Sequence, residues 1–192
     1  GFEATSVLAL AAGTGVTGLR WLRIAQREHY LAGSVSRFAA RWWWLGPNVL
    51  LAGATAVAAL GAAASPLPAF VAAAGVAVGP FGLSVRGRTS ALAWTRRMRT
   101  LAGVWLGLQL LVIAVGLAVG SGPLLAALGA LAAPVLVDLA LVITAPIERK
   151  LGARFVESAA AKLTSIQPTV VAITGSYGKT STKGYVAHLV AG

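Results

Sequence analysis

The chain contains no cysteine and only five acidic residues among its 192 residues. Without cysteine there can be no disulfide, no thiolate metal site and no cysteine nucleophile. Charged residues make up 11% of the chain, whereas a soluble domain usually has about 25%. So few charges could not cover a water-facing surface. Because 57% of the residues are hydrophobic, we expect most of the chain to be embedded in a membrane.

The basic residues give a net charge of +11, but they do not form the folded basic face that nucleic-acid binding requires. The arginines cluster between apolar runs, in segments 20–41 and 86–99. This pattern is typical of the cytoplasmic loops of a membrane protein. We therefore expect a multi-pass protein of the plasma membrane with membrane lipid, and not nucleic acid, as a partner. The N-terminus is predicted to lie outside and the residues after 147 in the cytoplasm.

Long uncharged runs predict a mainly α-helical, polytopic membrane region over residues 1–147, because a span needs about 20 apolar residues. The prolines of segments 65–68 and 120–123 divide the two longest runs, since proline interrupts a helix. Pro80 is expected to kink the span that contains it. About five transmembrane helices are predicted, near 4–22, 45–64, 68–85, 101–119 and 124–146.

The character of the sequence changes after residue 147. Apolar residues recur every three or four positions between charged ones over 148–168, which predicts an amphipathic linker helix. The β-branched, apolar run 169–174 then predicts a buried parallel strand. With the glycine-rich segment and the helical pattern that follow, residues 169–192 are predicted to be the incomplete start of an α/β ATP-binding domain of the P-loop type.

The segment after the predicted strand has the residues that a phosphate-binding loop needs. Glycines allow a tight turn and a close approach to phosphate, and N–H groups at a helix N-terminus bind anions. Lys179, the predicted catalytic residue, would bind the β/γ-phosphates of ATP, and the hydroxyl of Thr180 would ligate Mg²⁺. The usual pattern would have glycine at Ile173, so an ordinary Gly/Ser/Thr turn is the alternative. The predicted ATP-binding residues are Gly175, Ser176, Tyr177, Gly178, Lys179, Thr180 and Ser181.

The segment Thr174–Lys183, TGSYGKTSTK, closely resembles the phosphate loop of the Mur ligase family. Pro168 and the apolar run that follows it, at 169–174, are also similar to this family. Within it, Ser176-Tyr177 and the Ser-Thr-Lys sequence at 181–183 are most similar to the branch that joins D-alanyl-D-alanine to UDP-N-acetylmuramoyl-tripeptide. The resemblance covers residues 148–192, and the membrane region is similar to that of some membrane-attached relatives.

The resemblance implies an ATP- and Mg²⁺-dependent amide ligase of peptidoglycan precursor synthesis. In such enzymes a substrate carboxylate becomes an acyl phosphate, which an amine then attacks. The implied partners are ATP, a peptidoglycan precursor and an amino acid or dipeptide. Since the chain runs from Gly1 to Gly192, we expect it to be the N-terminal part of a longer protein and to be inactive alone.

Asp138 is the ionisable residue inside a predicted span, and such residues often mark functional sites. It is expected either to line a substrate path or to bind a structural partner such as a serine, threonine or arginine near a helix end. A path would favour a second hypothesis, a transporter or flippase-like protein with a nucleotide-binding cytoplasmic domain. A non-catalytic membrane scaffold is the third. Trp42, Trp43 and Trp44 are interpreted as an interfacial aromatic belt.

Overall fold

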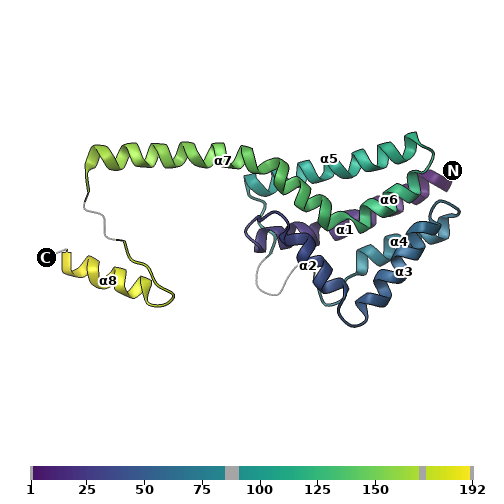
Figure 1. The fold of residues 1–192 in the computed structure, drawn as a ribbon, viewed down its shortest axis with the longest axis horizontal. Helices are drawn as coiled ribbons and strands as arrows, with labels where there is room; N and C mark the ends of the chain where they lie inside the picture. The colour runs from purple at the N-terminus through teal and green to yellow at the C-terminus, as the bar shows by residue number, and fades with distance from the viewer. Residues whose placement is uncertain (1, 85–90, 169–171, 191–192) are drawn as a thin grey trace. The chain divides into compact units, whose positions relative to one another are not determined.

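The fold was analysed in a computed structural model that describes residues 2–84, 91–168 and 172–190. Within these ranges the secondary structure is helical, without a strand (Figure 1). The helices are α1 (Phe2–Arg27), α2 (Ser34–Trp43), α3 (Asn48–Gly61), α4 (Pro66–Val78), α5 (Arg96–Ala118), α6 (Gly122–Leu131), α7 (Ala133–Ile166) and α8 (Lys179–Val190).

The chain divides into two compact units, Gly1–Arg149 and Lys150–Gly192. The first unit is a helical bundle in which α1 contacts α2, α4, α5 and α6. The second unit contains the end of α7, the glycine-rich loop and α8. α7 continues without interruption to Ile166, and Gln167-Pro168 follows it.

Large side chains fill one core of the bundle, where α1, α2, α5 and α7 meet. Trp21, Met98 and Trp105 are buried there beside Val35 and Val137. α5 and α7 are far from α1 and α2 in the sequence. The burial of these side chains therefore fixes how those helices are arranged.

A second core contains mainly alanine, from α1, α3, α4 and α6. Small side chains let helix backbones approach closely, which is how helices in membranes commonly pack. At Gly13 of α1, an added Cβ would lie 2.6 Å from the carbonyl oxygen of Ala73 in α4. The contact between α1 and α4 therefore requires glycine at this position.

Two helices, α1 and α5, are long and apolar enough to cross a membrane. Two bent pairs raise the number of spans to at most four: α2 with α3, bent by 104°, and α6 with α7, bent by 74°. The prediction of about five spans is therefore wrong for the part of the chain that the structure describes. The finding of two to four such helices is consistent with a membrane protein.

The prediction failed because α3 and α4 are too short to be separate spans. They have 14 and 13 residues, which correspond to about 20 Å of helix, whereas the hydrocarbon core is about 30 Å thick. α4 ends at Val78, before Gly79-Pro80. A residue before proline is disfavoured in the α conformation, so Pro80 lies beyond the helix end and does not kink α4.

The prediction that residues 169–192 begin an α/β P-loop domain is also wrong for the described residues. Positions 169–171 lie outside the described ranges, and positions 172–174 form no strand. Ala172 and Thr174 are exposed and Ile173 is half-buried. A buried parallel strand requires neighbouring strands that accept its hydrogen bonds and cover its faces. The described ranges contain no such neighbour, so an apolar run alone did not produce a strand.

Candidate functional site

The predicted phosphate loop is an exposed turn that leads directly into α8. Gly175 and Gly178 have φ angles of 150° and 76°, and the second lies in the left-handed region that favours glycine. α8 begins at Lys179, and the amide of Thr182 donates to the carbonyl oxygen of Gly178 at 2.8 Å. Gly178 therefore ends the turn and the helix starts immediately after it.

Lys179 bends back over this turn. Its Nζ donates a hydrogen bond to the carbonyl oxygen of Gly175, so the ammonium group is held beside the loop. The predicted site residues 175–181 are all exposed. A charged side chain held beside a glycine turn at a helix N-terminus is an arrangement that can bind an anion.

The donors of this loop suit a phosphate group. They include the first amides of α8, the Lys179 ammonium and the hydroxyls of Thr180 and Ser181. Thr180 supplies a hydroxyl oxygen of the kind that ligates Mg²⁺ beside a phosphate. Among the described residues no group of three or more His, Cys, Asp or Glu side chains is placed to hold a metal. A magnesium ion here would therefore depend on phosphate oxygens and water for its other ligands.

Asp138 lies in the other unit and binds the N-terminus of α2. Its carboxylate accepts hydrogen bonds from the amide of Val35 at 3.2 Å, the amide of Ser36 at 2.8 Å and the hydroxyl of Ser36 at 2.6 Å. The first amides of a helix have no partner within the helix, and a carboxylate also interacts favourably with the positive end of the helix dipole. Of the two alternatives for Asp138, the structure therefore supports the structural partner.

Arg20 is buried in the bundle and binds the C-terminal end of α4 and the residues after it. Its Nε donates to the carbonyl oxygen of Leu83 at 2.9 Å, and its Nη2 donates to that of Ala77 at 3.0 Å. Nη1 donates to the carbonyl oxygens of Val76 and Gly79. The guanidinium thus donates to carbonyl oxygens at and beyond the end of α4, where the amides of the helix no longer supply a donor.

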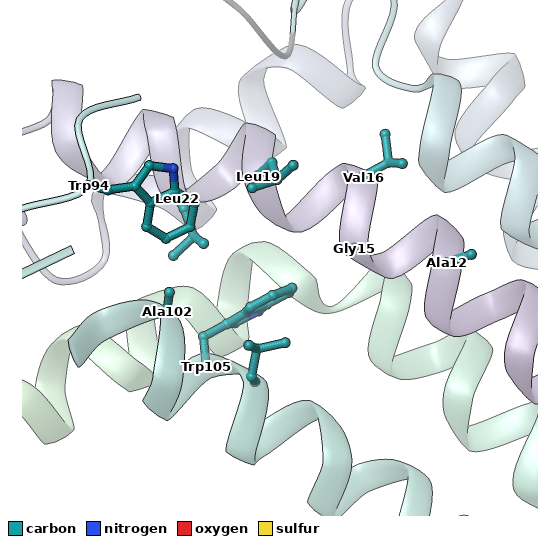
Figure 2. A pocket seen from close by; sticks show the side chains of 9 residues that line it. Ala12, Gly15, Val16, Leu19, Leu22, Trp94, Ala102 and Trp105 are labelled. Carbon is teal, nitrogen blue, oxygen red and sulfur yellow. The ribbon is translucent and has the colours of Figure 1, made fainter. Parts of the chain in front are cut away.

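A shallow apolar groove of about 410 Å³ lies between α1 and α5 (Figure 2). The ring of Trp105 projects from α5 toward α1, where it fits because position 18 is glycine. The groove carries no ionisable side chain and supplies no group for acid–base or nucleophilic chemistry. It is lined by Ala12, Gly15, Val16, Leu19, Leu22, Trp94, Ala102, Trp105 and Leu106.

Segment 20–41, which was expected to be a basic loop, is largely helical. α1 continues to Arg27, and α2 occupies most of the rest. The helical spacing of Ser34, Arg37, Phe38 and Arg41 was the signal for α2. The binding of Arg20 to α4 left no signal in the sequence, because its acceptors are backbone carbonyls.

No protein-family model, no curated protein and no solved structure matches this chain.

Proposed function

We propose that the chain supplies the membrane anchor and the phosphate-binding loop of an ATP-dependent, Mur-type amide ligase of peptidoglycan precursor synthesis. One observation carries the proposal: the sequence Thr174–Lys183 resembles the phosphate loop of that family, and its lysine lies against a glycine turn at the start of α8. The proposal concerns the chemistry of this segment. The residues that bind the precursor, the amino acid or dipeptide and further magnesium ligands would lie outside this sequence.

The proposed roles follow from the positions of the side chains. The amides at the start of α8 and Lys179 would bind the phosphates of ATP, with Thr180 beside the magnesium ion. The hydrogen bond from Lys179 to Gly175 holds the ammonium near the turn, and a phosphate would replace the carbonyl as its partner. Bound ATP supplies the phosphoryl group that activates a substrate carboxylate for attack by an amine.

The contacts of Asp138 favour the ligase over a transporter. A substrate path or proton relay requires an ionisable group with access to the substrate, whereas both carboxylate oxygens of Asp138 bind the start of α2. The scaffold hypothesis has no specific observation in its favour. A lysine held over a glycine turn would fit the nucleotide-binding domain of either a ligase or a transporter, so the contacts of Asp138 and the ligase-like sequence of the loop distinguish the two.

The proposal also includes an orientation. Residues from the two arginine-rich segments meet at one end of the bundle, where Gln26 binds Ala93 and Arg97 lies over the ring of Tyr30. The positive-inside rule then places this end in the cytoplasm. Three crossings, by α1, α5 and the α6–α7 pair, would put the N-terminus outside and the glycine-rich loop in the cytoplasm, where ATP is available. α3 and α4 would form a hairpin that enters and leaves on the cytoplasmic side.

The proposal is tested with Lys179→Ala in the complete protein, with Lys183→Ala as a matched control one helical turn further along α8. Removing Lys179 takes away a charge-assisted contact with phosphate, and such contacts are worth about 1.5–3 kcal/mol. We expect ATP affinity to fall by at least about tenfold and ATP-dependent ligation to be lost. The readouts are binding of a fluorescent ATP analogue and ATP turnover with a peptidoglycan precursor and an amino acid or dipeptide.

The control variant removes the same charge from the same helix, so it should bind and turn over ATP almost as the wild type does. Gly178→Val should also abolish binding, because valine is strained at a φ of 76°. ATP turnover by Lys179→Ala at the wild-type rate would refute the ligase proposal.

A further inference from the structure

The short helix α2 has one face that is rich in arginine. Ser34, Arg37, Phe38 and Arg41 are spaced at i, i+3, i+4 and i+7, so they lie on one side of the helix. The opposite side contributes Val35 and Ala39 to the core of the bundle. α2 is therefore an amphipathic helix that is docked on the protein by its apolar side.

The arginine-rich face lines a polar pocket of about 220 Å³, together with Glu28 from the turn after α1. The Arg37 Nε donates to the carbonyl oxygen of Gly33 at 2.9 Å, which fixes its side chain along the helix. Arg41 has no hydrogen bond or ion pair among the described residues. The pocket thus contains a positioned guanidinium and one that lacks a partner.

Glu28 does not neutralise these two arginines. Its Oε1 lies 3.2 Å from the Nη2 of Arg27, whose guanidinium in turn lies 4.8 Å from the ring centre of Phe38. The carboxylate in the pocket is already paired, while the charges of Arg37 and Arg41 remain without an acidic partner in the described part of the chain. The pocket is therefore suited to an anion.

The position of α2 indicates where that anion comes from. α2 is bent by 104° from the apolar helix α3. If α3 enters a bilayer near its normal, α2 lies close to the membrane plane. Trp44 and Leu45 occupy the bend and are 76% and 53% exposed, and tryptophan favours the level of the lipid headgroups. An amphipathic helix with arginine on its polar face is typical of this interface.

We infer that the pocket lined by Glu28, Ser34, Arg37, Phe38 and Arg41 binds the phosphodiester of an anionic phospholipid headgroup. The guanidinium of arginine binds phosphate through two parallel N–H donors. The occupant is a membrane lipid and not free phosphate, because the exposed Trp44 and Leu45 of the bend follow Arg41 of the pocket by three and four residues along the chain. This site is independent of the proposed nucleotide loop.

The inference is tested with the full chain purified in maltoside micelles. Phosphatidylglycerol and phosphatidylcholine are titrated separately, and bound lipid is counted by native mass spectrometry. Arg37→Ala/Arg41→Ala is compared with Arg96→Ala/Arg99→Ala, which removes the same charge from exposed positions of α5. We expect the pocket variant to bind phosphatidylglycerol at least about tenfold more weakly than the wild type does. The α5 variant should stay within about threefold, because it removes only general attraction.

Equal loss in the two double variants would overturn the inference, because binding would then reflect net charge alone. Equal binding of the two lipids by the wild type would also contradict it. An excess of inorganic phosphate should leave the lipid bound, and displacement would instead identify a site for free anions. If the alanine variant does not fold, the double variant Arg37→Lys/Arg41→Lys tests the pocket in its place. Lysine keeps the charge but lacks the paired donors, so the affinity for phosphatidylglycerol should fall at least about threefold. Wild-type affinity in this variant would refute the proposal that the pocket binds the lipid phosphate.

Discussion

Arg20 and Asp138 are charged side chains that the bundle buries, and each binds the backbone at a helix end. Arg20 donates to carbonyls at the end of α4, and Asp138 accepts from amides at the start of α2. Each side chain is therefore placed where the sign of its charge complements the helix dipole. These contacts connect α1 with α4 and α7 with α2, so they fix helix order as well as satisfying backbone groups.

Asp138→Ala should destabilise the bundle by about 1–3 kcal/mol, because two amides at the start of α2 would lose their acceptor. Ser36→Ala removes one of the three hydrogen bonds to the carboxylate and should cost about 1 kcal/mol. Unfolding by denaturant in detergent micelles measures both changes. Asp138→Ala with unchanged stability would remove the structural role assigned to this residue.

At the scale of helices, close packing of small residues determines which helices touch. Gly13→Ala should destabilise the protein by about 1–3 kcal/mol, because the new Cβ would lie 2.6 Å from a backbone oxygen of α4 that cannot move independently. Gly15→Ala is the matched control on the same helix. Nothing lies within 4 Å of its added Cβ, so this change should be neutral or stabilising by up to about 1 kcal/mol. Thermal unfolding of the two variants should separate them clearly, and equal melting temperatures would contradict the packing described for α1 and α4.

The sequence predicted the apolar character of these helices better than their lengths. Uncharged runs do mark where α1, α3, α4 and α5 lie, because apolar helices need few charges. Their ends depend on particular prolines: Pro47 and Pro66 lie at the starts of α3 and α4, and Pro80 follows the end of α4. The predicted strand at 169–174 failed for a different reason, since a strand depends on partners that are not encoded in its own residues.

At the scale of the whole molecule, the predicted orientation can be checked with single cysteines, because the chain has none of its own. Ser121→Cys lies in the turn between α5 and α6, and Ala91→Cys lies in the described part of the arginine-rich segment. A thiol reagent that cannot cross the membrane should label position 121 in intact cells and position 91 only after permeabilisation. The reverse pattern would invert the orientation and place the glycine-rich loop outside the cell.

The sequence predicted the local conformation of the candidate site but not the structure that surrounds it. Glycine at position 178 and lysine at 179 indicated a turn into a helix, and the structure has both features. Neither residue specifies what lies beside the loop. The arginine pocket on α2 was not predicted, because the arginines of segment 20–41 were interpreted as those of a loop, although the spacing of Ser34, Arg37, Phe38 and Arg41 is helical.

The binding of Arg20 to α4 has a consequence for the order of events during synthesis. The most distant of its acceptors, the carbonyl of Leu83, lies 63 residues further along the chain. At a synthesis rate of about 5–20 residues per second, these partners emerge about 3–13 seconds after Arg20 does. During this interval the guanidinium of Arg20 has none of these acceptors. An arginine at the centre of a span disfavours entry into lipid by about 2.5–3.5 kcal/mol, and the cost is smaller near a helix end such as that of α1, where Arg20 lies. The first helix therefore gains its full preference for the bilayer only after α4 has left the ribosome, and the two helices are expected to enter the membrane together.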